Sequence, residues 1–128
     1  MPQQLAAIAL LVPDYDEAKQ YYTEVLGFDL VEDTPQGPHK RWLMVRPPGS
    51  ACALLLAKAV NPAQAARIGD QTGGRVFLFL HTDDFWRDYH AYAARGVAFR
   101  ETPREEEYGT VVVFADRYGN LWDLIQRR

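Results

Sequence analysis

The side chains that could carry acid–base or metal chemistry are few and widely spaced along the 128-residue chain. The three histidines, His39, His81 and His90, stand apart, and a shifted metal site would have to combine one of them with Glu107 or Asp123. Alternatively, His81 and Asp123 could form an acid–base pair if the fold brings them together. Isolated histidines without ligand spacing are usually structural or surface residues, so the sequence predicts no particular reaction.

Motifs for nucleophilic catalysis and phosphate binding are missing from the sequence. Cys52 lies in an apolar stretch, where a cysteine behaves as a small buried hydrophobe, and no Ser-His-Asp or Cys-His arrangement can be defended. Gly73-Gly74 precedes an expected strand and does not open a helix, unlike a phosphate-binding loop. Arg41 and Arg75 could each bind a carboxylate or phosphate, or simply lie in water at a strand end.

Composition and charge narrow the class of protein. With 48% apolar and 24% charged residues, the chain matches a single globular domain. A formal charge of -3 lacks the basic excess that nucleic-acid phosphates require, so no nucleic-acid partner is expected. The longest apolar run, residues 5–12, is far shorter than the roughly 18 residues of a membrane span. One cysteine and no secretory leader predict a cytoplasmic protein without disulfides.

The chain contains a repeated order of elements. Residues 5–12 predict a buried strand, and Asp14 caps a helix whose apolar stripe runs to Leu26 before Gly27 ends it. Further strands are expected at 28–32, 41–46 and 51–57. The second half repeats this order, with a strand at 75–82, a helix from Asp84 to Gly96, and strands at 97–101, 110–115 and 121–126.

The spacing of equivalent residues supports a duplication. Asp84 and Asp14, Tyr92 and Tyr22, and Gly119 and Gly49 are each 70 positions apart, whereas Gly96 and Gly27 are 69 apart. We therefore expect one domain over residues 1–128, with module one at 5–57, a linker at 58–74 that includes a short helix at 63–68, and module two at 75–126. Each module has strands and one helix, which predicts an α+β fold.

Two segments resemble the vicinal oxygen chelate superfamily, which includes glyoxalases, bleomycin-resistance proteins and extradiol dioxygenases. Residues 14–28, DYDEAKQYYTEVLGF, are similar to its first helix signature, and residues 116–124, DRYGNLWDL, to its closing turn and strand. The resemblance spans nearly the whole chain. It implies paired βαβββ modules that form a curved mixed sheet around a cleft, and in the enzymes a divalent metal held by four strands.

The resemblance places the usual metal ligands at positions that this chain has altered. The first ligand of each module falls on Ala7 and on Phe77, neither of which can bind a cation. Of the two positions that are commonly Glu, one is Asp123 and the other falls on the apolar residues 53–55. A catalytic zinc normally keeps three protein ligands, so we expect no metal at the family site and no cofactor.

An aromatic cleft with a few polar groups would suit a small molecule. Strand alternation puts Phe77, Phe79 and His81 on one face, although His81 could also simply touch solvent at the strand end. Arg41 and Trp42 are neighbours on one strand, so only one is expected to line the cleft. The predicted ligand-binding residues are Arg41, Trp42, Phe77, Phe79, His81, Tyr108, Phe114 and Asp123.

Two of these residues are predicted from their places near the last strands. Tyr108 follows the charged stretch 104–107, which we interpret as a solvated loop that could also cover the cleft. Phe114 lies 70 positions after Met44, and both are expected to face the cavity.

Two functions are consistent with these features. We favour a metal-independent small-molecule binding protein of the glyoxalase/bleomycin-resistance type, whose ligand is largely apolar or aromatic and carries an anionic group near Arg41 or Arg75. The alternative is a metal-dependent lyase, isomerase or dioxygenase of the same superfamily with a non-standard site. The resemblance also implies a homodimer, with modules paired within a chain or between chains.

Overall fold

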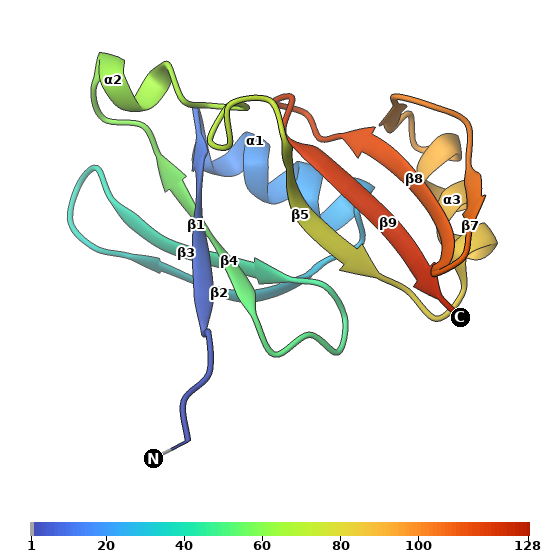
Figure 1. Ribbon diagram of the computed structural model, residues 1–128. Coiled ribbons are helices and arrows are strands. Elements are labelled where there is room, and N and C mark those ends of the chain that lie inside the picture. The colour runs from blue at the N-terminus through green and yellow to red at the C-terminus, as the bar shows by residue number, and fades with distance from the viewer. Residues whose placement is uncertain (1) are drawn as a thin grey trace. The chain divides into compact units, whose positions relative to one another are not determined.

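The computed structural model describes residues 2–128, which divide into two compact units, one ending at residue 68 and the other covering residues 69–128. Figure 1 shows the first unit from blue to green and the second from yellow-green to red. Each unit contains one mixed sheet and a helix that packs on it. None of the helices in the described part of the chain is long and apolar enough to cross a membrane.

The first unit contains a four-stranded sheet in the order β1-β4-β3-β2. Its strands are β1 (Ala7–Val12), β2 (Asp29–Pro35), β3 (Arg41–Arg46) and β4 (Ala53–Lys58). The outer strand β1 pairs with β4 in parallel, and the other pairs are antiparallel. A short helix α2 (Pro62–Ala65) follows β4 and is capped by Asn61, whose side chain accepts a hydrogen bond from the Gln64 amide at 2.8 Å.

The helix of the first unit changes its winding part-way. α1 (Tyr15–Gln20) begins where the Asp14 carboxylate accepts the Glu17 amide at 2.8 Å, and it continues as the π-helix η1 (Tyr21–Val25). The Leu26 amide donates to the Tyr21 carbonyl at 3.1 Å, five residues back. The sequence predicted the cap and the end of this helix but gave no sign of the π turn.

The second unit has the same plan. Its strands are β5 (Val76–His81), β6 (Ala98–Phe99), β7 (Arg104–Glu106), β8 (Gly109–Ala115) and β9 (Leu121–Arg127), and its helix is α3 (Phe85–Ala94). The strand order of the sheet is β5-β9-β8-β6. β7 also pairs with β8, at residues 109–111, whereas β6 pairs with residues 114 and 115 of the same strand. β5 pairs with β9 in parallel, as β1 does with β4.

The common strand order confirms the predicted α+β fold of two βαβββ modules. Gly27 and Gly96 both follow the helices at positive φ, 73° and 81°, a conformation that side chains disfavour. Gly49 and Gly119 likewise occupy the turns before the last strand of each unit at φ of 81° and 97°. The repeated residues therefore mark equivalent places in two similar sheets.

Some predicted elements need correction. The stretch 104–107 is not simply a loop, because residues 104–106 form β7, whose Glu105 side chain accepts the Thr110 hydroxyl on β8 at 3.0 Å. The linker helix is shorter and earlier than residues 63–68. β5 contains a register irregularity between Val76 and Leu78, so the strand does not alternate regularly from its first residue.

The core of the second unit is aromatic and lies between α3 and the sheet. Phe114 is fully buried; its ring stacks on Trp122 at 5.7 Å and meets Tyr92 of α3 edge-on at 5.5 Å. These contacts assign Phe114 and Trp122 to the helix-covered face. Residues 113 and 123, which alternate with them and pair with each other, lie on the opposite face, which we call the open face.

Phe114 is therefore a core residue, which corrects the expectation that it faces a cavity. The pair Val45 and Leu54 in the first unit corresponds to the pair Phe114 and Trp122, because both pairs lie on the buried faces of their sheets. The counterpart of Phe114 is thus Val45, 69 positions earlier (114 minus 45), and not Met44. A shift of one residue moves a side chain to the other face of a strand.

A glycine contact joins two loops of the second unit. A Cβ on Gly69, whose φ is +76°, would lie only 1.9 Å from the Tyr118 carbonyl oxygen. The turn containing Tyr118 is held by Asp116, whose carboxylate accepts the Tyr118 and Asn120 amides at 3.0 Å and the Trp122 indole at 3.1 Å. The loop at Gly69 can approach this turn closely only without a side chain.

We expect Gly69→Ala to destabilise the protein more than Gly73→Ala. Both glycines have positive φ, so both variants carry the same kind of backbone strain, but a Cβ on Gly73 meets nothing within 4 Å. The extra cost at Gly69 is a steric clash of about 1–3 kcal/mol. Urea unfolding of the two variants measures the difference, and equal midpoints would contradict the contact.

Candidate functional site

A pocket of the first unit lies where β3 and β4 diverge. Pairing between these strands is limited to Met44 with Leu55 and Val45 with Leu54, so the start of β3 and the end of β4 are not joined. A pocket of about 600 Å³ opens there, within the range of small-molecule sites. We call it the β3–β4 pocket; residues that line it include Tyr15, Lys40, Arg41, Trp42, Leu55, Ala57, Lys58 and Val60.

The walls of the β3–β4 pocket are mostly apolar and its rim is basic. Trp42, Leu55 and Ala57 come from the two diverging strands, and Tyr15 comes from the start of α1. Lys40 and Lys58 are exposed and, among residues 2–128, have no carboxylate within ion-pair distance. The pocket thus combines aromatic surface with uncompensated positive charge.

Arg41 is already occupied by carboxylates of the protein. Its Nε and Nη2 donate to the two oxygens of Asp33 at 3.0 and 2.7 Å, and its Nη1 donates to Asp16 at 2.7 Å. Its guanidinium also lies 5.2 Å from the centre of the Tyr15 ring. Arg41 therefore positions Tyr15 and α1 at the pocket, and its positive charge is already balanced by two carboxylates of the protein, which weakens its attraction for the anionic ligand group expected beside it.

These contacts also control the ionisation of Asp33. Hydrogen bonds from Arg41 and then from Lys19, whose Nζ lies 2.9 Å from Asp33 Oδ2, lower the Asp33 pKa from 3.8 to about 2. The carboxylate therefore stays charged at any ordinary pH.

Both residues predicted on β3 line the same pocket. The expectation that only Arg41 or Trp42 could do so assumed a pocket on one face of a continuous sheet. The β3–β4 pocket instead opens through the gap between two strands, so that consecutive residues of β3 border it. Lys40, Lys58 and Tyr15 were not among the predicted residues, since nothing in the local sequence marks a gap between strands.

The second unit places Asp123 and Phe79 together on its open face. Phe79 of β5 pairs in register with Asp123 of β9, which pairs in turn with Val113 of β8. Phe79 is 62% exposed, an unusual state for a phenylalanine. Asp123 is half-buried, and its Oδ1 is shielded from solvent and has no hydrogen-bond partner in the described structure.

The unpaired oxygen gives Asp123 unusual electrostatics. Burial raises the pKa of Asp123 above its ordinary value, the Arg104 charge opposes this rise, and the Glu101 charge adds to it. Glu101 is itself held by Arg104 at 3.1 Å and by the Val113 amide at 3.0 Å. An under-solvated carboxylate of this kind can accept a hydrogen bond from a ligand or take up a proton.

The remaining predicted residues of the second unit do not form one site. Phe77 lies at the irregular start of β5, and His81 is exposed at the other end, paired in register with Ile125. No hydrogen bond joins His81 to Asp123 in the described structure, so the acid–base pair is not formed. Tyr108 is 41% exposed in the turn between β7 and β8.

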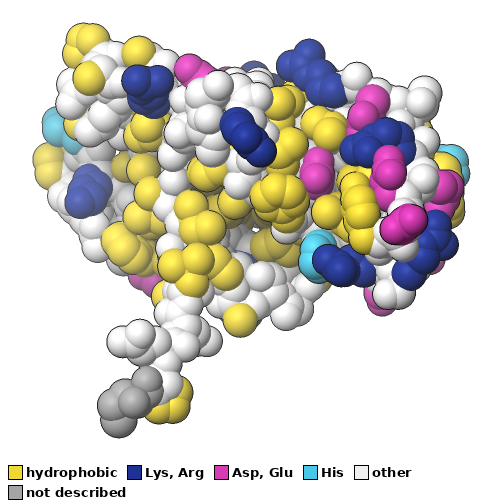
Figure 2. All heavy atoms as spheres, in the orientation of Figure 1, with side chains coloured by type: hydrophobic (Ala, Val, Ile, Leu, Met, Phe, Trp, Pro, Cys, Tyr) yellow, Lys and Arg dark blue, Asp and Glu magenta, His cyan; other side chains and the backbone are white. Residues whose placement is uncertain are grey.

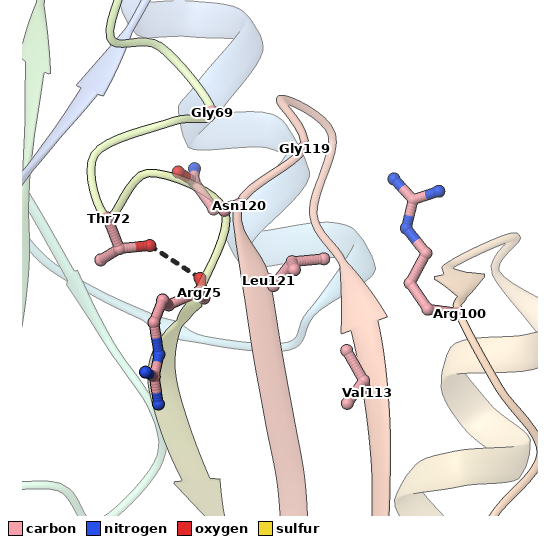
Figure 3. A pocket seen from close by; sticks show the side chains of 9 residues that line it. Gly69, Thr72, Arg75, Arg100, Val113, Gly119, Asn120 and Leu121 are labelled. Atoms are coloured by element: carbon pink, nitrogen blue, oxygen red, sulfur yellow. Dashed lines mark hydrogen bonds between the residues drawn. The ribbon is translucent and has the colours of Figure 1, made fainter.

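A smaller pocket of about 410 Å³ lies at the start of β5 and β9 in the second unit (Figure 3). Arg75 and Arg100 stand on either side of it, and Val113 and Leu121 lie between them. Figure 2 shows that elsewhere in this unit, around β7, basic and acidic side chains are intermixed. Ion pairs such as Arg104 with Glu101 and Arg128 with Glu105 belong to that region.

The donor set does not fit the divalent metal that the superfamily's enzymes use. Nowhere in residues 2–128 do three His, Cys, Asp or Glu side chains come together in a way that could hold an ion. On the open face, Asp123 has Phe79 and Val113 as its strand neighbours, and neither offers a donor. Ala7 has a methyl group where the first ligand would be.

Residues 4–124 match the family model of the Glyoxalase/Bleomycin resistance protein/Dioxygenase superfamily. The chain therefore belongs to this superfamily, also called the vicinal oxygen chelate superfamily. It is 57% identical to an uncharacterized protein of Shewanella frigidimarina (strain NCIMB 400) over 128 residues, which cover 98% of this chain and 95% of the relative.

Two solved structures share the fold along nearly the whole chain. UcmS2 is 30% identical with a TM-score of 0.84, covering 98% of each chain. TnmS3, an antibiotic binding protein from Streptomyces sp. CB03234, is 33% identical with a TM-score of 0.80, covering 99% of this chain and 98% of its own.

Asp33→Asn should weaken the fold at neutral pH and have less effect in acid. The Asp33 pKa lies below its unfolded value, so the carboxylate contributes stability above pH 4 that is lost as the pH falls towards about 2. We expect a loss of about 1 kcal/mol at pH 7 by urea unfolding. Asp29→Asn, at an exposed position of β2, is the matched control. An effect independent of pH would contradict the assignment.

Asp123→Asn should stabilise the fold at neutral pH, the opposite of the effect expected for Asp33→Asn. Because burial raises the Asp123 pKa in the folded state, the carboxyl favours folding below its unfolded pKa, and this contribution is lost as the pH rises through the folded pKa. Removing the charge should raise the melting temperature by about 2–4 °C at pH 7 and have little effect near pH 3. Glu107→Gln, in an exposed turn, is the control and should leave the melting temperature unchanged at both pH 7 and pH 3. Destabilisation by Asp123→Asn at pH 7 would refute this account.

Proposed function

We propose that the protein is a metal-independent binding protein for a largely apolar or aromatic small molecule. The observation that carries the proposal is the β3–β4 pocket, which has about 600 Å³ of space beside Trp42, Tyr15 and Leu55. Apolar and aromatic walls with a few polar groups are the usual composition of a small-molecule site. Sequestering a ligand needs such a pocket and no reacting group.

The basic rim favours an anionic or electron-rich substituent on the ligand. Arg41 is engaged by Asp33 and Asp16, so the charges that remain for the ligand are those of Lys40 and Lys58. The ammonium group of a lysine lies at the end of a flexible side chain, so it can reach anionic substituents at different positions on a ligand. Lysines therefore favour recognition of the ligand's charge over its exact shape. TnmS3 is an antibiotic binding protein of the same fold, and we infer that aromatic antibiotics are a suitable first class of ligands to test.

The alternative enzyme function rests on Asp123. A carboxyl group whose pKa is raised by burial has the property that general acids and bases require. A reaction that uses it should be lost in Asp123→Asn, whereas ligand binding in the β3–β4 pocket should not change. The expected homodimer stays a prediction, which light scattering on the eluted protein can test.

Binding should quench the fluorescence of Trp42. We expect some members of a panel of aromatic antibiotics and simple aromatic acids to quench tryptophan emission and to raise the melting temperature, equally with and without EDTA, because no ion takes part. Trp42→Phe should lose most of the quenching. Trp86→Phe, at a 46% exposed position on α3, is the matched control and should retain it.

Two outcomes would reject the proposal. Stabilisation that disappears with EDTA would show that an ion is required for binding. Quenching that survives in Trp42→Phe and is lost in Trp86→Phe would place the ligand away from the β3–β4 pocket.

A further inference from the structure

We propose that the second unit has its own binding site, in which Arg75 and Arg100 flank an apolar floor and their positive charges attract the carboxylate of an apolar organic acid. This site is the pocket of about 410 Å³ at the start of β5 and β9, and we call it the Arg75–Arg100 pocket. All of its lining residues belong to residues 69–128, and none borders the β3–β4 pocket. The inference therefore does not depend on the proposed function.

The pocket has an apolar floor between two basic side chains. Val113 of β8 and Leu121 of β9 lie on the open face of the sheet, and Figure 3 shows Arg75 beside the start of β5 on one side and Arg100 beside β8 on the other. The rim includes backbone at Gly69 and Gly119, which come within contact distance of each other's loops. The ring or short alkyl chain of an organic acid can lie on this apolar floor, with the carboxylate of the acid near one of the guanidinium groups.

The two guanidinium groups differ from three other arginines of this unit, which are engaged by carboxylates. Arg87, Arg104 and Arg128 each donate to a carboxylate of the protein at 3.2 Å or less. Arg75 and Arg100 have no carboxylate partner among residues 2–128, and no lining residue of their pocket is acidic. A guanidinium is always charged and carries only donors, so these two groups can be satisfied by an oxyanion.

The other polar side chains of the pocket are already used. The Thr72 hydroxyl donates to the Arg75 carbonyl at 2.7 Å, as Figure 3 shows, and the Asn120 amide donates to the Asp116 carboxylate at 3.0 Å. What the pocket still offers to a ligand is apolar surface and two cationic donors. This combination selects an apolar carboxylate over a neutral polar molecule or a cation.

The acidic side chain nearest in sequence does not cancel this charge. Glu101 follows Arg100 directly, but its carboxylate accepts Arg104 Nε at 3.1 Å and the Val113 amide at 3.0 Å. These contacts hold Glu101 towards β7 and β8, and it does not line the pocket. Arg100 therefore remains available.

The test is an NMR titration of the full-length protein with 1-naphthoate and with its neutral analogue 1-naphthalenemethanol. Backbone amides of Gly69, Gly74 and Gly119 report on the pocket because all three residues line it. We expect naphthoate to shift these amides and to bind about tenfold more tightly than the alcohol, as charge-assisted hydrogen bonds require.

Single-residue variants test whether naphthoate binding depends on Arg75 and Arg100 or only on the positive charge of the surface. Arg75→Gln and Arg100→Gln should each weaken naphthoate binding by about five- to tenfold and leave binding of the alcohol unchanged. Arg127→Gln is the matched control, since Arg127 is an exposed arginine at the far end of β9 and does not line the pocket. It should bind naphthoate like the unaltered protein.

Three results would overturn the inference. These are equal affinity for naphthoate and the alcohol, unchanged naphthoate affinity in both Arg75→Gln and Arg100→Gln, and shifts confined to the β3–β4 pocket. Equal binding of inorganic phosphate would overturn the part of the inference that requires an apolar body. The proposed function in the first unit would be untouched by any of these results.

Discussion

In each unit a helix packs on one face of the sheet, and this constraint determines which side chains face away from the core. The helix buries one face of its own sheet, as Phe114 and Trp122 show in the second unit. Because strand side chains alternate, the residues between them must face the other way. Asp123 and Val113 are those residues, and the apolar floor of the Arg75–Arg100 pocket is a product of the same alternation.

The predictable part of the fold is the part that local chemistry determines. Asp14 and Asp84 cap helices because their carboxylates bind amides three residues on, and Gly27 and Gly96 end them at positive φ. Such signals need no distant partner, so they can be found in the sequence. Because these caps and glycines occur in the same order in both halves of the chain, they indicate two similar modules. Together with the family signatures, the repeat predicts the fold.

Errors arose where a distant strand decides the outcome. A count of 70 from Met44 puts Phe114 on the wrong face of its strand, because the modules differ by 69 here, as they do between Gly27 and Gly96. Arg41 could not be recognised as an occupied residue, because its partners Asp33 and Asp16 lie 8 and 25 positions away. Pairing and register are long-range properties, and single-strand patterns do not contain them.

The duplicated units have diverged at the place where a pocket can open. β8 and β9 pair from Ala115 as far as Gly109, where a Cβ would lie 2.1 Å from the Gln126 carbonyl oxygen, so this approach requires glycine. The register equivalent of Gly109 in the first unit is Lys40, 69 positions earlier (109 minus 40). Lys40 carries a side chain at that point, and β3 and β4 pair only at Met44 with Leu55 and Val45 with Leu54, so the two strands are already apart before Lys40. The unit whose strands stay paired thus has glycine at this position, and the unit whose strands separate has Lys40, which lines the β3–β4 pocket with its positive charge.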